Sequence, residues 1–270
     1  MKRQRMSHLW WFDLSNSLFR LKGLLFLVPF LVFWYPILRI INNHLSAWMY
    51  RQESLAFAYS VLDPAVVNKL LIEHPPSLSI YFLTALSVFP FFAILAGASQ
   101  FGPDLANGYF KLTSTRCLRI EVFISRYLSA LSLMIAAITL VSLVAGLISA
   151  TKDNYSPAEV MSYLGQVCLM LYLYAAALLA FMTIISSFSR SAIAALFFGT
   201  FGYLLIVLII WLGNEPETTR EILPYLLPSA LKQDLLLINN ESSFIAIAIL
   251  PLYAFIYGWI GWQIFKRVNF

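Results

Sequence analysis

The sequence predicts an all-α polytopic membrane protein, because of its composition and because of six long apolar runs. Of its 270 residues, 60% are hydrophobic and 11% are charged, whereas soluble domains carry about 25% charged residues. A helix needs about 20 apolar residues to cross a bilayer, and the sequence shows no strand-like alternation in short segments. One transmembrane domain is therefore expected over residues 1–270, with spans at about 23–41, 78–98, 127–150, 161–188, 192–212 and 243–265.

The first 22 residues are expected to form a helix that lies in the headgroup layer on one side of the membrane. Basic residues occur there together with tryptophans and leucines, among them Trp10, Trp11 and Leu14. This mixture suits an interfacial helix. The alternative is a disordered basic tail, which the two adjacent tryptophans disfavour.

Two sizeable polar loops are expected, at residues 42–76 and 213–241. In the first, Asp63-Pro64 is a helix start signal, with the acidic residue as N-cap and proline at the first helical position. A short surface helix should follow over 65–71. In the second, the segment 225–231 is apolar enough to contact the outer membrane interface. A tight turn at 189–191 should join the fourth span to the fifth.

Small and polar residues inside the spans indicate how the helices pack. Glycines let helices approach closely, and the candidates are Gly199, Gly202, Gly258 and Gly261, together with Ala176 and Ala180. Ser, Thr, Gln166, Tyr172 and Tyr174 are expected mostly to contact neighbouring helices, and a minority could line a substrate path. Arg39, near a span end, is the one ionisable residue expected within the spans, which disfavours a proton- or sodium-driven carrier.

A charged stretch, residues 100–126, separates the second span from the third. Gly102-Pro103 and Asn107-Gly108 are turn signals, and from Ile120 onward apolar residues recur at helical spacing. The stretch should therefore form a turn, a short surface segment, and an amphipathic helix that continues into the third span. A basic loop of this kind often only fixes the orientation of a membrane protein. Its charged residues are Asp104, Lys111, Arg116, Arg119, Glu121 and Arg126.

The order of residues in this stretch resembles the intracellular coupling segment of the type-2 family of ABC transporter permeases. That family shows an acidic residue, a glycine, a hydrophobic strip that ends near Ser or Thr, and a basic residue that opens the next span. The matching features are Asp104, Asn107-Gly108, Lys111-Leu112, Thr113-Ser114-Thr115, Arg119, Glu121 and Arg126-Tyr127-Leu128, with Arg116 where the family usually has proline. The tail 265–269 is similar to the family's terminal Phe-x-Arg-Arg-Asp.

The resemblance implies an N-terminal interfacial elbow helix, in which Asp13 and Arg20 match the family's charged positions, and a cytoplasmic coupling helix. It also implies the interface with an ABC ATPase subunit, which would include Asp104, Gly108, Lys111, Arg116, Arg119, Glu121 and Arg126. The family assembles as two permeases with two ATPase subunits. A second permease copy or homologue is therefore an expected partner, as are membrane lipid and possible extracytoplasmic proteins, whereas nucleic acid is not.

Orientation follows from the distribution of charge. Of the 18 Lys and Arg residues, twelve lie on the side that holds both chain ends and six on the other. Because the richer side is normally cytoplasmic, a multi-pass protein of the inner, cytoplasmic membrane with both termini in the cytoplasm is predicted.

No residue cluster in the sequence suggests catalysis. The two cysteines and three histidines are scattered, so neither a catalytic nor a metal site is expected. No Gly-x-x-x-x-Gly-Lys-Ser/Thr phosphate loop occurs, so this chain is not expected to hydrolyse ATP alone. The resemblance implies that ATP and Mg²⁺ bind the partner ATPase and that this chain carries no cofactor.

The function implied by the resemblance is ATP-driven export of an amphiphilic, lipid-linked, drug or peptide substrate through a non-catalytic permease subunit. The alternative is a mechanical transmission subunit that relays ATPase motion to an extracytoplasmic partner without moving a substrate. Loops 42–76 and 213–241 would then be the docking surface. A polytopic membrane enzyme is a third hypothesis, which lacks the cluster of catalytic side chains that it requires.

Overall fold

The computed structural model describes residues 8–15, 21–49, 58–60, 63–106, 117–212 and 223–268, and within these residues it contains helices and no strand. Six of the helices are long and apolar enough to cross a membrane. The six predicted spans are thereby confirmed as helices of spanning length. They are α2 (Leu21–Met49), α5 (Pro76–Ala98), α8 (Arg119–Lys152), α9 (Pro157–Phe188), α10 (Ala192–Leu212) and α13 (Glu241–Phe265).

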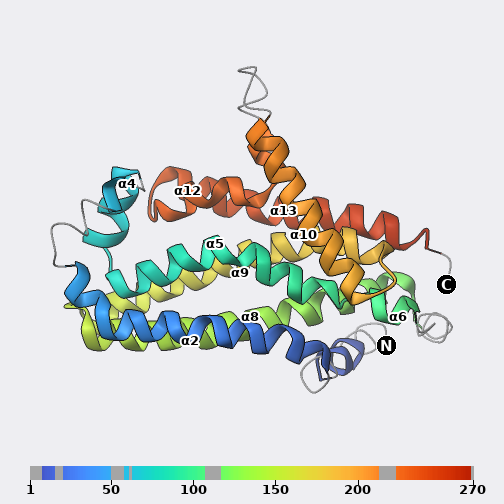
Figure 1. Ribbon diagram of the computed structural model, residues 1–270, viewed down its shortest axis with the longest axis horizontal. Helices are drawn as coiled ribbons and strands as arrows, with labels where there is room; N and C mark the ends of the chain where they lie inside the picture. The colour runs from blue at the N-terminus through green and yellow to red at the C-terminus, as the bar shows by residue number, and fades with distance from the viewer. Residues whose placement is uncertain are drawn as a thin grey trace.

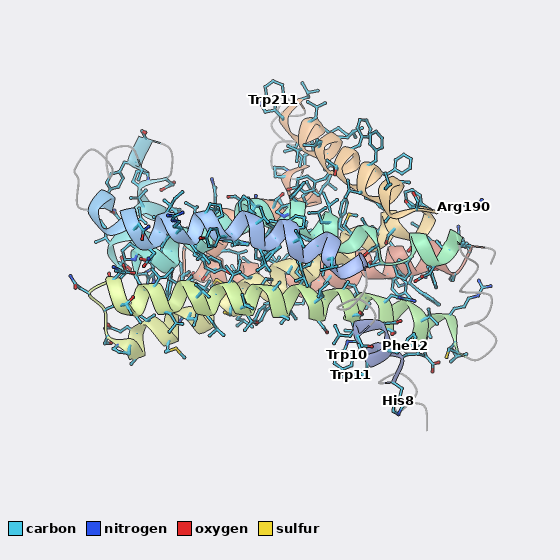
Figure 2. The ribbon with its side chains drawn as sticks, turned by 60° about the horizontal axis from the view of Figure 1, so that its bottom comes forward. His8, Trp10, Trp11, Phe12, Arg190 and Trp211 are labelled. Atoms are coloured by element: carbon cyan, nitrogen blue, oxygen red, sulfur yellow. The ribbon has the colours of Figure 1, made fainter. Side chains whose placement is uncertain are left out.

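The helices form an elongated bundle in which α9 lies among its neighbours (Figure 1). In α5 and α9, 61% of the residues in the most apolar part are buried, compared with 11% in α10. Helices α2, α5, α8, α9 and α13 follow the long axis of the bundle, whereas α10 is inclined away from it (Figure 1). Figure 2 shows the difference clearly, because Trp211 near the end of α10 projects far from the bundle.

An aromatic column joins α2 to α5. The rings of Phe30 and Phe92 lie 4.8 Å apart in an edge-to-face arrangement, and those of Trp34 and Tyr81 are 4.9 Å apart. All four side chains are almost fully buried. Aromatic pairs of this geometry contribute about 0.5–1.5 kcal/mol each beyond the area that they bury. They fix α2 in place even though Pro29 and Pro36 interrupt its hydrogen bonding.

Hydrogen bonds made by side chains connect α5, α8 and α9 inside the bundle. Ser79 pairs with Tyr163 at 2.9 Å, and the hydroxyl of Tyr127 donates to the Ala176 carbonyl at 2.9 Å. Tyr172 likewise contacts Thr139 at 2.7 Å. The expectation that Tyr172 contacts a neighbouring helix is therefore confirmed, and such bonds hold helices together where apolar burial cannot.

Close approach of three helices to α9 depends on glycine. A Cβ at Gly97 of α5 would lie 2.5 Å from Met182 Cβ, and a Cβ at Gly199 of α10 would lie 2.7 Å from Met182 Cε. At Gly261 of α13 a Cβ would overlap the hydroxyl of Thr183. The predicted packing role is confirmed for Gly199 and Gly261. By contrast, a Cβ at Gly202 would make only ordinary contact, and one at Gly258 would meet nothing.

The ends of the helices follow the predicted signals in several places. The Asp63 carboxylate accepts from Ala65 N at 2.8 Å, and the short helix α4 (Pro64–Val67) continues as the π-helical turn η1 (Asn68–Ile72). Residues 189–191 form the turn between α9 and α10. The segment 223–236 folds as η2 (Leu223–Leu226), η3 (Pro228–Leu231) and α12 (Lys232–Leu236).

Two local predictions differ from the structure. The first helix continues to Met49, beyond the predicted end at residue 41, because polarity ends a membrane span without ending a helix. Gly102-Pro103 begins the short helix α6 (Gly102–Ala106) instead of a turn. Proline is favoured in the first helical turn, and Gly102 has no side chain to clash with Ser191, whose backbone would lie 2.9 Å from a Cβ.

We expect Gly261→Ala to lower the free energy of unfolding by about 1–3 kcal/mol, the usual penalty for overpacking a buried contact. Thermal unfolding of the detergent-purified protein would measure the change. Gly258→Ala on the same helix is the control, and it should be neutral or slightly stabilising, because alanine favours helix by about 1 kcal/mol. Equal midpoints for the two variants would show that α13 does not depend on this contact with Thr183.

Candidate functional site

A buried cluster of three charged side chains lies at one end of the bundle. Nη2 of Arg126 is 2.8 Å from Oδ2 of Asp104, and Nη1 is 3.3 Å from Oδ1 of Asp13. The Ser125 hydroxyl donates to Oδ2 of Asp13 at 2.6 Å. Asp13 is 2% exposed and Asp104 is 8% exposed. Together these contacts join the helical segment 8–15, α6 and α8 at one point.

The chemistry of this cluster makes it a strong mechanical link. Opposite charges attract strongly where they are largely shielded from water, and here one arginine forms ion pairs with two carboxylates from different segments. Separating the partners would leave charges buried without compensation, which typically costs several kcal/mol. The three elements are therefore expected to move together.

An aromatic cluster surrounds the same end of the bundle. Phe101 and Phe123 stack nearly parallel with ring centroids 5.4 Å apart, and Phe265 lies 5.0 Å from Phe101. Phe101 comes three residues before Asp104, and Phe123 comes three residues before Arg126. This packing includes the end of α13, so four segments from distant parts of the chain meet here.

The helical segment 8–15 has one face toward α8 and one face outward. Trp10 Nε1 donates to the Ser132 hydroxyl at 3.2 Å, and Asp13 is buried against Ser125 and Arg126. Trp11 and Phe12 are 64% and 50% exposed, and both project from the segment in Figure 2. A helix with these two faces suits the boundary between protein, lipid and water.

The start of α8 also holds the end of α13. The Glu121 carboxylate accepts from Leu118 N at 3.0 Å, which satisfies a backbone donor at the helix start. Nη1 of Arg119 donates to the carbonyls of Lys266, at 2.9 Å, and Val268, at 3.3 Å. A cation at this position stabilises the unpaired carbonyls and the negative end of the helix dipole.

A small polar cavity of about 20 Å³ lies next to the charged cluster. Gln100, Arg126 and Ser129 contribute polar groups to its lining. The Gln100 side chain is 5% exposed, and its carboxamide has no hydrogen-bond partner among the described residues. This space has about the size that one water molecule requires, so it is too small for an organic substrate.

The predicted interface residues thus fall into three groups. Asp104 and Arg126 are brought together with the predicted elbow residue Asp13, and all three are internal instead of lying on a surface segment. Arg119 and Glu121 serve the ends of α13 and α8. Gly108, Lys111, Arg116 and the elbow residue Arg20 lie outside the described residues, so their roles stay predictions.

Sequence reasoning did not find the partners of these charges. Ser125, the aromatic cluster and the carbonyls at the end of α13 were not expected to take part. One available signal was the repeated spacing of an aromatic residue three positions before a charged one, at Phe101–Asp104 and Phe123–Arg126. On a helix this spacing places both side chains on the same face.

The opposite end of the bundle carries a second folded surface. Asp153 accepts from the backbone N and the hydroxyl of Ser77, at 3.1 and 2.8 Å, and so caps the start of α5 from the end of α8. The ring of His74 stacks on Tyr163 at 4.4 Å, and burial lowers the pKa of this histidine. Among the described residues, no group of three or more His, Cys, Asp or Glu side chains could hold a metal ion.

Arg126→Gln is expected to lower the free energy of unfolding by about 3–5 kcal/mol, because two buried carboxylates would lose their counter-charge. Adding Asp13→Asn and Asp104→Asn to the same chain should restore roughly half of the loss or more, since the buried negative charges would then be absent. Thermal unfolding followed by tryptophan fluorescence would measure both effects. Arg190→Gln, an exposed residue in the α9–α10 turn, is the control, and a loss no larger than that of the control would contradict a linking role for the cluster.

Comparison with known proteins identifies a family and does not identify an activity. No curated protein matches the chain. A family described as "Protein of unknown function (DUF2705)" matches residues 37–270. The match covers α5, α8, α9, α10 and α13 in full and begins inside α2. The chain therefore belongs to the DUF2705 family.

Proposed function

We propose that this chain is the transmembrane permease subunit of an ABC exporter-like complex. The observation that carries the proposal is the anchoring of the segment between α5 and α8. Asp104 precedes residues 107–116, Arg126 follows them, and the two side chains form one buried ion pair. A segment held at both ends in this way transmits a force applied to it directly into the bundle.

The proposed mechanism assigns the chemistry to a partner and the movement to this chain. A separate ATPase subunit would bind and hydrolyse ATP with Mg²⁺, and this subunit would have no catalytic role. Closure of the ATPase would displace residues 107–116. The displacement would reach α8 through Arg126 and the segment 8–15 through Asp13, which would act as the elbow helix. Switching between two arrangements of packed helices is a common way to couple such movements.

Charge supports placing this end of the bundle in the cytoplasm. Arg119, Arg190, Lys266 and Arg267 all lie at this end within the described residues, close to α6, α8 or the end of α13. A surplus of basic residues on one side of a membrane protein normally marks the cytoplasmic side. The host membrane would be the inner, cytoplasmic membrane.

The exposed apolar surface of α10 supports a dimeric permease. Of the residues in α10, only Ala195 and Gly199 are buried. A second copy of the chain, packed against the exposed side, would complete a path between two subunits. With no mid-span charge in the described helices, the path suits amphiphilic, lipid-linked, drug or peptide substrates better than ions.

Mechanical transmission without transport is the second candidate, and the folded outer surface favours it. The hydroxyls of Tyr253 and Tyr257 donate to the carbonyls of Tyr225 and Leu226 and so hold η2 against α13. This surface, together with α4 and η1, could dock an extracytoplasmic protein. ATP-dependent movement of substrate into sealed vesicles without such a protein would exclude pure transmission.

The first test is purification of the tagged chain from its native host in mild detergent, followed by mass spectrometry. We expect a soluble protein with a phosphate loop to co-purify in a fixed ratio. Reproducible absence of such a protein from an intact preparation would contradict the ABC assignment.

Charge reversal would then locate the interface. Lys111→Glu combined with Arg116→Glu is expected to reduce ATPase co-purification at least about tenfold, since each charged contact contributes on the order of 1 kcal/mol or more. Arg119 is left intact because it also holds the end of α13. Arg190→Glu is the matched control and should keep the ATPase. Loss of the ATPase in both variants, or in neither, would contradict coupling through residues 107–116.

A further inference from the structure

An open groove of about 380 Å³ runs along the last turns of α13. Its lining changes in character along the helix: Trp259 and Ile260 come first, then Gln263 and Ile264, and finally Arg267. These positions follow one stripe of the helix. At 1.5 Å per residue, the stripe extends about 12 Å from the apolar end to the arginine.

Basic side chains gather where the groove ends. Lys266 and Arg267 are exposed, and Arg119 is held beside them by its contacts with the carbonyls of Lys266 and Val268. The acidic residue nearest to Arg119 along the described chain is Glu121, whose carboxylate contacts Leu118 N. Arg119, Lys266 and Arg267 thus bring three positive charges to the end of α13.

The neighbouring surface is suited to lipid. Trp259 is 56% exposed, and Phe255 and Ile256, one turn earlier, are also exposed. In a helix that crosses a membrane, such side chains contact acyl chains, and tryptophan with arginine marks the depth of the headgroups. A water-soluble protein could not reach the apolar part of this groove.

We propose that the groove binds one anionic phospholipid. Arg267 would pair with the phosphate group, with Lys266 and Arg119 adding positive potential. Gln263 would donate to a phosphate or ester oxygen, and one acyl chain would lie against Trp259, Ile260 and Ile264. The combination of a polar headgroup site with an apolar groove selects a phospholipid over a free anion. This inference depends on α13 crossing the membrane and not on the ABC assignment.

Bound lipid would stabilise the end of α13 against α8. The lipid phosphate and the Arg119 side chain would both contact the end of the same helix, one from the bilayer and one from the protein. Anionic lipid should therefore raise the unfolding temperature of the whole bundle.

The test uses the full-length protein purified in a neutral detergent. Phosphatidylglycerol is expected to raise the midpoint of thermal unfolding in a saturable manner, while phosphatidylcholine with the same acyl chains has a smaller effect. Arg267→Gln should weaken the apparent affinity for phosphatidylglycerol about fivefold, as expected for one basic residue at a membrane surface, without changing the midpoint in detergent alone. Native mass spectrometry should show one retained phosphatidylglycerol per chain, with a smaller lipid-bound fraction in this variant.

Arg190→Gln is the matched control, because it removes an exposed positive charge at the same end without touching the groove. It should keep the affinity of the unaltered protein. Equal effects of the two lipids, or equal losses in the two variants, would overturn the proposal in favour of non-specific attraction. A comparable stabilisation by glycerol phosphate alone would overturn it in favour of a simple anion site.

Discussion

The contact of Arg126 with both Asp13 and Asp104 is the constraint on which this end of the molecule depends. An arginine in a largely buried position requires counter-charge, and two carboxylates from separate, earlier segments of the chain supply it. The requirement fixes where the segment 8–15 and α6 lie relative to α8. Because the same turn of α8 carries Phe123, the charged cluster and the aromatic cluster hold each other in position.

The rest of the bundle is organised around α9. Met182 and Thr183 lie where α5, α10 and α13 come closest to it, and each approach uses a glycine. Small residues permit close contact between backbones, which is the main source of attraction between helices in lipid. The charged cluster thus fixes the segment 8–15 and α6. The glycine contacts with Met182 and Thr183 fix α5, α10 and α13 against α9.

The sequence predicted the spans well because long uncharged runs have few alternatives in a membrane protein. The sequence did not predict that the helix α2 continues beyond the apolar run, past residue 41. No proline or glycine ends the helix there. The charged residues of the candidate site were identified, whereas their partners were not. Asp13 and Ser125 are 112 residues apart, and no periodic pattern in a single sequence reports such a contact. The role of residues 107–116 stays a prediction.

The inclination of α10 bears on how the chain is made. This helix is the most apolar of the six, yet in the described structure only Ala195 and Gly199, both in its first half, are buried. Insertion of α10 therefore depends mainly on the transfer of its own side chains from the translocon into lipid. In that transfer each Leu, Ile or Phe contributes about −0.3 to −0.6 kcal/mol, and a charged residue at the helix centre costs about 2.5–3.5 kcal/mol. A charge near the middle of α10 would cause a defect of biosynthesis, whereas the same change in α9 would cause a defect of the finished bundle.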